Sequence, residues 1–95
     1  MNANAQYHAN RLASGSGGAC RLWHSGELAS WYAGRAAGEN IACVGPCPAD
    51  GAEAMSMWLN SPEHRVNIFD AGFRYIGVGT ACDGRVMFAV VHFRS

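Results

Sequence analysis

The last quarter of the chain contains two long apolar runs, and these constrain the fold more than any other feature. "RYIGVGTAC" (74–82) and "RVMFAVVHF" (85–93) flank Asp83-Gly84, a dipeptide that predicts a two-residue β-hairpin loop. Both runs are apolar on both faces, so the sheet they form must be covered on both sides. Because helical segments precede the hairpin, we predict an α+β fold: an α-β-α sandwich with a small antiparallel sheet.

The preceding segments supply those elements. Residues 4–14 carry apolar side chains at helical spacing, and residues 21–37 show no clean period, which predicts an ordered loop with at most a helical turn. "ENIAC" (39–43) is short and apolar and predicts a strand. Asp50 is a predicted N-cap with Glu53 as its capping-box partner, for a helix that ends near Asn60. Ser61 and Pro62 open a further helix that Gly72 closes.

The length and charge narrow the class of protein. Ninety-five residues make one domain, which we place over 1–95, and seven basic and seven acidic residues balance to a net charge of zero. A balanced charge argues against nucleic acid or an anionic membrane as partner. No segment approaches the roughly 20 apolar residues of a membrane span. No signal peptide is visible, so a secreted protein would have lost its targeting segment from this sequence.

The four cysteines are Cys20, Cys43, Cys47 and Cys82. An even count in a small, loop-rich chain predicts two disulfides and an extracellular, oxidising location, with buried free thiols as the alternative. The only close pair is C-x3-C, whereas four-thiolate zinc sites usually show two C-x2-C pairs. Zinc on cysteine is therefore disfavoured.

The histidines are the residues most able to carry chemistry. His8 and His92 lie within the first predicted helix and the last predicted strand, where we expect ordinary core or polar roles. His64 lies in the first turn of a helix, where the dipole disfavours the imidazolium. A neutral imidazole is what a metal ligand or general base needs. His24 lies in the loop after Cys20, and Glu39 opens a buried strand, so we ask whether His24, Glu39 and His64 converge.

The order of motifs along the chain resembles the CAP superfamily of cysteine-rich secretory, venom-antigen and pathogenesis-related proteins and their bacterial relatives. The phrases are "CRLWHS", "GENIA", "SPEHRVNI" and "FRYIGVG", followed by a closing strand, and the resemblance as a whole runs from about Ala5 to Phe93. "GENIA" and "SPEHR" are similar to the bacterial branch, and "CRLWHS" to the plant and animal branch. The resemblance implies an α-β-α sandwich, in agreement with the hairpin argument.

The resemblance also implies a cleft of two histidines and two acids. His24, Glu39 and His64 match three of the four positions. The second acid normally stands three residues after the tryptophan, but Trp58 is followed there by Ser61. Glu63 and Glu53 have plainer roles in dipole compensation and capping, so we leave the fourth position unfilled. We expect Asn40 to fix a turn through its amide.

Other departures from the family bear on completeness, ligands and cysteine pairing. The family has an additional helix before residues 4–14, so we expect a minimal member or a fragment. The tryptophan helix and the element that carries the second histidine abut, with Trp58 and His64 close in sequence, which leaves no room for the loop that sterol-binding relatives share. The resemblance implies a Cys20–Cys82 bridge. Cys43 and Cys47 remain, and the Gly45-Pro46 turn between them permits a short second bridge.

Three functional readings follow, from different classes. The first is a secreted, monomeric binding module of bacterial type whose His24/Glu39/His64 cleft takes zinc or another divalent metal, with a protein, lipid or small-molecule ligand as partner. The second is a hydrolase that uses the same residues to activate water. The third is a disulfide-stapled scaffold with a vestigial cleft. The resemblance does not imply a general enzymatic activity, and we expect a binding module rather than an enzyme.

Overall fold

A three-stranded antiparallel sheet forms the middle of the molecule, and its central strand is the last in the chain. In the computed structural model, which describes residues 1–95, β1 (Ala37–Val44) and β2 (Tyr75–Cys82) both pair with β3 (Met87–Arg94). β3 is buried along almost its whole length, as its apolar sequence predicts. The predicted strand at "ENIAC" lies within β1.

The predicted hairpin is confirmed, with its turn shifted by one residue. The N–H of Asp83 donates to the carbonyl of Val86 at 3.1 Å, which places Gly84 and Arg85 at the centre. Gly84 takes a φ of 97°, which suits glycine.

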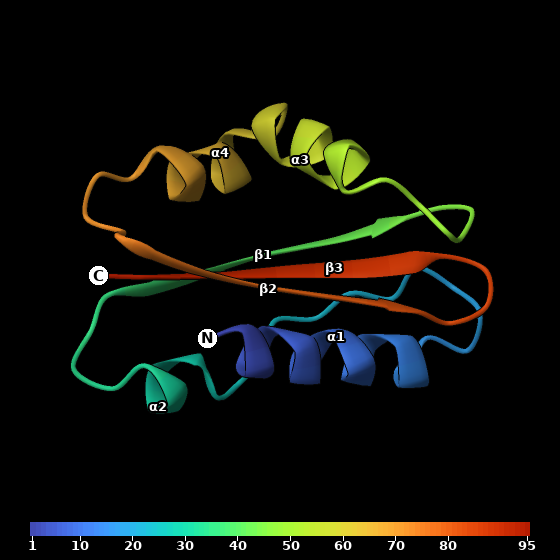
Figure 1. Ribbon diagram of the computed structural model, residues 1–95, viewed down its shortest axis with the longest axis horizontal. Coiled ribbons are helices and arrows are strands. Elements are labelled where there is room, and N and C mark those ends of the chain that lie inside the picture. Colours follow the sequence, from blue (N-terminus) through green and yellow to red (C-terminus); the bar gives the residue numbers. More distant parts are fainter.

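Helices cover the two faces of this sheet, so the predicted α-β-α sandwich is confirmed (Figure 1). α1 (Asn2–Gly15) and the single turn α2 (Leu28–Trp31) lie on one side, which we call the α1 face. α3 (Gly51–Leu59) and α4 (Pro62–Phe69) lie on the other, which we call the α3 face. None of the four helices is long and apolar enough to cross a membrane.

Strand alternation divides the core into two clusters. Ile41, Phe88 and Val90 point toward α1, where they pack against Ala5, Ala9 and Leu12, the periodic residues that predicted this helix. The other core cluster lies under α3 and comprises Ala42, Val44, Ala54, Trp58, Met87, Ala89, Val91 and Phe93. Successive residues of a strand point to opposite faces, so each of β1 and β3 serves both clusters.

Glycines bring α1 directly onto β2. A Cβ at Gly79 would lie 2.4 Å from the Cα of Gln6, and one at Gly77 would lie 2.5 Å from the main chain of Met1. Real Cβ atoms do not approach backbone this closely, so only glycine fits beneath the helix at these two positions. The "GVG" of the hairpin motif therefore sets the spacing of the layers on this side.

The α3 face is only partly covered, which corrects the expectation that both hairpin strands are buried on both sides. α3 and α4 lie over β1, and Ile76 and Val78 of β2 remain 57% and 49% exposed. Asp50 caps α3 as predicted, since its Oδ1 accepts from the N–H of Ala52 at 2.9 Å. The capping-box bond predicted for Glu53 does not form, and α4 ends at Phe69, before Gly72.

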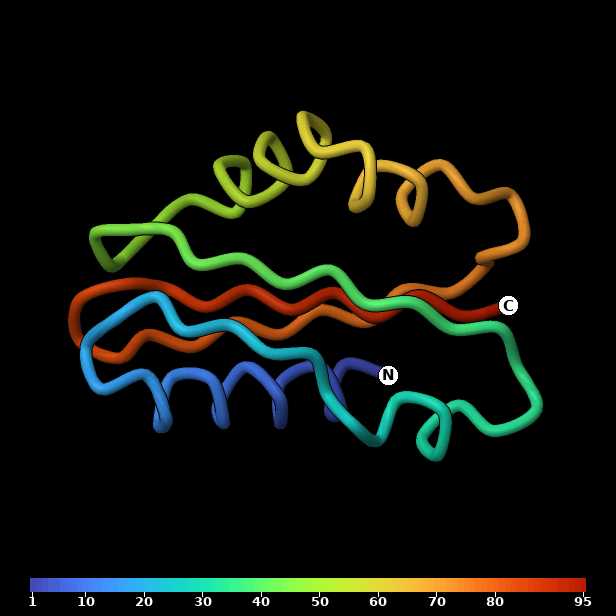
Figure 2. Tube along the Cα trace, turned by 180° about the vertical axis from the view of Figure 1, so that it is seen from behind, coloured from blue at the N-terminus to red at the C-terminus, as the bar shows by residue number.

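The segment between α1 and β1 turns back along the α1 side of the sheet (Figure 2). Its only regular element is the four-residue α2, so the predicted ordered loop with a single helical turn is confirmed. This return path brings Cys20 beside β1 and explains the disulfide it makes.

All four cysteines form disulfides, as predicted, but the predicted pairing is wrong. Cys20 bonds Cys43 and Cys47 bonds Cys82, with Cα–Cα distances of 5.7 and 6.3 Å. The reason is the parity of the strands. Cys43 shares the α1 face with Ile41, on the side where the loop carrying Cys20 runs, whereas Cys82 shares the opposite face with Val78. The N–H of Cys47 donates to the carbonyl of Arg85 at 2.9 Å, which holds Cys47 at the hairpin turn near Cys82.

Candidate functional site

Glu39 lies at the centre of a polar network on the α1 face, near the start of β1. It stands opposite His92 of β3 in the strand register, and His92 Nε2 donates a hydrogen bond of 2.7 Å to Glu39 Oε2. Directly opposed residues of an antiparallel pair point to the same face, so the pairing of the strands places both side chains together. Their side chains are 2% and 0% exposed respectively.

The loop before α2 supplies the remaining partners of this carboxylate. Glu39 Oε1 accepts from His24 Nδ1 at 2.8 Å and from the N–H of Ser25 at 2.9 Å. Its Oε2 also accepts from Ser25 Oγ at 2.7 Å. With the bond from His92, four donors surround one carboxylate, which satisfies the acceptor capacity of an ionised Glu.

The pKa of Glu39 reflects this arrangement. Burial by itself raises the pKa, because it disfavours the charged form. The hydrogen bonds from His92, Ser25 and His24 outweigh burial and lower the pKa from 4.5 to about 2. Glu39 is therefore a carboxylate at neutral pH, and it is held as one by its partners rather than by solvent.

His24 is the exposed member of the network. Its side chain is 65% exposed while the carboxylate that holds it is buried. Because Glu39 can only accept, His24 Nδ1 carries the proton of this bond, and the neutral ring keeps its lone pair on Nε2. No hydrogen bond within the chain uses His24 Nε2. The structure thus presents one oriented imidazole nitrogen to the outside.

Contacts with α1 fix the loop that carries His24. His8, fully buried in α1, bonds the carbonyl of Trp23 through Nε2 at 2.7 Å. Arg11 donates to both oxygens of Glu27 at 2.6 and 3.1 Å and to His8 Nδ1 at 2.9 Å. The Cys20–Cys43 bridge ties the start of the same loop to β1. His8 is a core residue, as predicted, and its core role is to hold the loop.

Two aromatic side chains, Tyr32 and Trp31, pack against His92. Tyr32 and His92 share a hydrogen bond of 2.7 Å between the hydroxyl and Nδ1. When His92 is neutral and its Nε2–H donates to Glu39, Nδ1 accepts the tyrosine proton, so both ring nitrogens are satisfied. The ring of Trp31 lies 5.8 Å from that of His92. Sequence reasoning assigned His92 an ordinary role and missed its place in the site. Only the β1–β3 register reveals it.

His64 lies apart from this network, so the predicted convergence of three residues is wrong. It belongs to α4, on the α3 face (Figure 1), where its Nδ1 bonds Ser61 Oγ at 2.9 Å. Its carbonyl accepts from the Asn40 amide at 3.1 Å, and Asn40 Oδ1 accepts from Asn67 at 2.9 Å. Asn40 therefore anchors α4 to β1 rather than fixing a turn. Glu39 and Asn40 are neighbours in one strand and point to opposite faces, and this parity separates the two histidines.

The residues present do not fit the zinc site that the sequence predicted. Zinc sites take at least three protein ligands. No group of three histidine, cysteine or acidic side chains is placed to hold an ion. Both oxygens of Glu39 already accept two hydrogen bonds each, and only His24 Nε2 remains available in the network. Glu39 therefore orients His24 through a hydrogen bond rather than binding a metal ion together with it.

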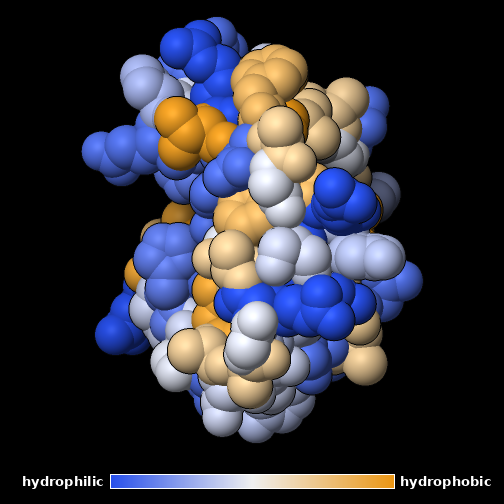
Figure 3. Space-filling view, turned by 90° about the vertical axis from the view of Figure 1, so that its left-hand side faces the viewer, coloured by the Kyte–Doolittle hydropathy of each residue, from blue (hydrophilic) through white to orange (hydrophobic).

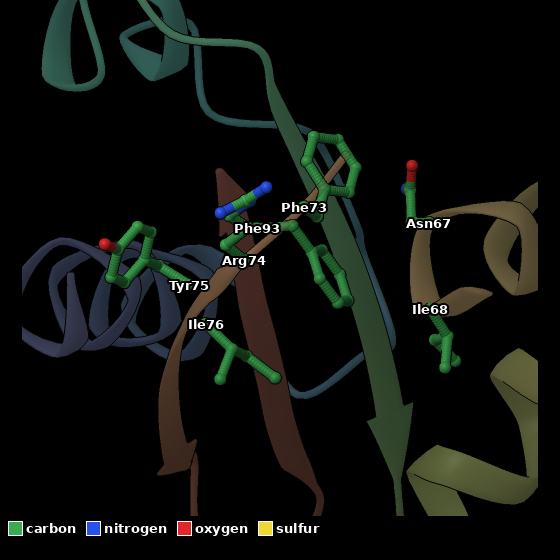
Figure 4. Close-up of a pocket in the computed structure, with 7 residues that line it drawn as sticks. All are labelled: Asn67, Ile68, Phe73, Arg74, Tyr75, Ile76 and Phe93. Atoms are coloured by element: carbon green, nitrogen blue, oxygen red, sulfur yellow. The ribbon is translucent and has the colours of Figure 1, made fainter. Parts of the chain in front are cut away.

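One cavity exists, and it lies on the α3 face at the same end of the sheet (Figure 4). Its volume is about 200 Å³, and Ile68 from α4 faces Ile76 and Phe93 from the sheet across it. Phe73 stacks on Phe93 with ring centroids 5.7 Å apart. Figure 3 views this end directly and shows hydrophobic side chains gathered in its upper part, on the side of α4. Phe93 follows His92 in β3, so adjacent residues of one strand reach the cavity and the polar network.

The sandwich, its disulfides and the loop histidine bound to the Glu of "GEN" define the class of protein. They match the arrangement implied by the CAP-like motifs, apart from the position of His64. A family model described as "CAP: Cysteine-rich secretory protein family" matches residues 1–93. The chain therefore belongs to the CAP family. No curated protein matches the chain significantly.

Proposed function

We propose that this CAP domain is a secreted binding module that engages a protein partner through the loop of Leu22, Trp23 and His24. The observation that carries the proposal is the buried Glu39, which holds the exposed His24 in one orientation. An oriented polar group at the surface costs little entropy on binding, because its rotamer is already fixed.

The neighbours of His24 favour a protein partner. Trp23 is 42% exposed, and Leu22 beside it is similarly exposed. Tryptophan is enriched among the residues that dominate the energy of protein interfaces. The disulfide at Cys20 and the hydrogen bond from His8 to the carbonyl of Trp23 also restrain the loop. A rigid loop with an aromatic anchor and an oriented imidazole is suited to docking without rearrangement.

The only cavity argues against a drug-sized small molecule as the main ligand. Small-molecule sites usually enclose about 300–1,000 Å³, whereas this cavity holds about 200 Å³ and lies on the other face from His24. The two disulfides support the secreted location, because such bonds persist in oxidising compartments.

The test is capture from the extracellular medium, followed by affinity measurement with the purified partner. Wild type and Phe69→Ala should bind the same protein, since Phe69 is exposed on α4, on the opposite side of the sheet. Trp23→Ala should weaken that binding by about 30-fold or more, the loss of about 2 kcal/mol typical of a hot spot. His24→Ala should also weaken it. Equal affinity for all four proteins would refute the proposal.

A second candidate is a hydrolase, and the Glu39–His24 pair is the observation that favours it. A carboxylate that fixes Nδ1–H leaves Nε2 free to take a proton from water and stabilises the imidazolium that results. No serine or cysteine is bonded to His24 Nε2, so water would be the nucleophile. Turnover of ester and peptide substrates that His24→Gln abolishes and His64→Gln preserves would support this candidate over the binding module.

A further inference from the structure

β2 is an edge strand, and its free edge lacks the usual protection. Its sequence, "YIGVGTAC", contains no charged residue and no proline, the two devices that most often keep edge strands from pairing with other chains. Ile76 and Val78 add exposed apolar side chains along the same strand. Short uncharged segments of this kind are prone to strand pairing when they are open.

Two amide side chains of α1 occupy this edge. Asn2 Oδ1 accepts from the N–H of Val78 at 2.9 Å. Gln6 makes both bonds to Thr80, with Oε1 accepting from its N–H at 3.2 Å and Nε2 donating to its carbonyl at 2.7 Å. Asn2 and Gln6 are four residues apart and so lie on one side of the helix. They match the spacing of Val78 and Thr80, whose main-chain groups both point outward from the sheet.

The close packing of α1 holds these amides in place. Gly77 and Gly79 alternate with Val78 and Thr80, and they let the backbone of α1 rest directly on the strand. Gln6 Nε2 also donates to Asn10 Oδ1 at 2.9 Å, which steadies the side chain from the next turn of the helix. The first turns of α1 thus present amide groups where the main chain of a fourth strand would lie.

We propose that Asn2 and Gln6 close the β2 edge against a second copy of this chain, and that without them two copies pair through β2. The second copy fits because an antiparallel pair of β2 strands is two-fold symmetric about Val78, which sets Thr80 of each chain opposite Ile76 of the other. The pairing would join two sheets into one and place the exposed Ile76 and Val78 side chains of the two copies beside one another on the same face. The net charge of zero opposes it only weakly.

The experiment compares the mass in solution of four proteins over a wide range of concentration. Wild type and Ser14→Ala, a control on the same helix with an exposed side chain, should remain monomers. Asn2→Ala/Gln6→Ala should show a concentration-dependent doubling of mass. Adding Val78→Pro should return the mass to that of a monomer, because proline removes the outward N–H and is tolerated at an edge.

Hydrogen exchange gives a second readout that does not depend on dimer formation. In wild type the amides of Val78 and Thr80 should be protected although they lie at an edge, and Asn2→Ala alone should release Val78 more than Thr80. Circular dichroism confirms that each variant is folded. A folded Asn2→Ala/Gln6→Ala variant that stays monomeric, a dimer that Val78→Pro leaves intact, or unprotected Val78 and Thr80 amides in wild type would each overturn the proposal.

Discussion

Glu39 and His92 face each other across β1 and β3, 2.7 Å apart, and neither is accessible to solvent. The pair joins the strand that opens the sheet to the strand that closes the chain. It also organises His24, because the same carboxylate binds both imidazoles. The stability of the sheet and the geometry of the exposed histidine therefore depend on one side chain.

Replacing Glu39 by Gln should destabilise the fold. The amide keeps the shape, but its NH2 group meets donors from His92 and Ser25, so at least one buried donor loses its acceptor. We expect the free energy of unfolding to fall by about 2–4 kcal/mol, as for other buried charged hydrogen bonds. Urea unfolding measures it. The control is Glu63→Gln, an exposed residue of α4, which should change the value by about 0.5 kcal/mol or less.

The lowered pKa of Glu39 predicts a loss of stability in acid. Its pKa is about 2 in the fold and 4.5 without its partners, so between these values the unfolded chain binds the additional proton. Stability from this group is fully present above pH 4.5 and is lost as pH falls toward 2. Asp83 also titrates near 2, through its bonds with Ser16 and the hairpin turn.

Urea unfolding at several pH values isolates the contribution of Glu39. The difference in unfolding free energy between wild type and Glu39→Gln should shrink across this window, because Asp83 contributes equally to both proteins. A difference that is constant with pH would show that Glu39 has an ordinary pKa.

The disulfide pairing predicts that loss of each bridge affects stability and binding differently. Cys20–Cys43 and Cys47–Cys82 span 23 and 35 residues, and the loop-entropy relation gives about 3.5 and about 4 kcal/mol respectively. Cys47→Ser/Cys82→Ser should lower stability and leave binding through Trp23 and His24 intact. Cys20→Ser/Cys43→Ser should lower both, because it frees the start of the site loop. Peptide mapping without reduction checks the pairing directly, and a Cys20–Cys82 peptide would contradict it.

Gly79→Ala should destabilise the protein more than a glycine-to-alanine change at a position that does not contact α1. The new Cβ would meet the main chain of Ala5 and Gln6, which cannot move aside as a flexible side chain can. Overpacking of this kind costs about 1–3 kcal/mol. Gly51→Ala provides the control, since nothing lies within 4 Å of its added Cβ. Thermal unfolding of the two variants should separate clearly, and similar melting temperatures would show that α1 lies farther from β2.

The layers of this fold could be predicted from local patterns, whereas the partners within the site could not. The apolar runs beside Asp83-Gly84 predict a covered hairpin, and the spacing of Ala5, Ala9 and Leu12 predicts α1. The role of His92 and the two disulfides depend on which strand residues share a face. That information requires the pairing of β3 with β1 and with β2, and no local signal contains it, since Glu39 and His92 alone are 53 positions apart.

The same dependence explains the error over His64. The motif order indicated a cleft, but a separation along the sequence does not say which side of a sheet a helix covers. Asn40 was the informative neighbour: its bonds to Asn67 and to the His64 carbonyl hold α4 against the α3 face. An asparagine that directly follows the site glutamate in one strand must point away from the site.

The adjacency of His92 and Phe93 gives the Glu39–His92 pair a role as a lock on strand register. If β3 slipped by one residue against β1, Phe93 would face the carboxylate, and His92 would enter the apolar cluster beneath α3 and α4. Both exchanges are costly, because one leaves a buried charge without its donor and the other buries an imidazole among hydrocarbon side chains. A sheet of three short strands, whose core-facing side chains are mostly apolar, thus has one buried polar pair that favours a single alignment.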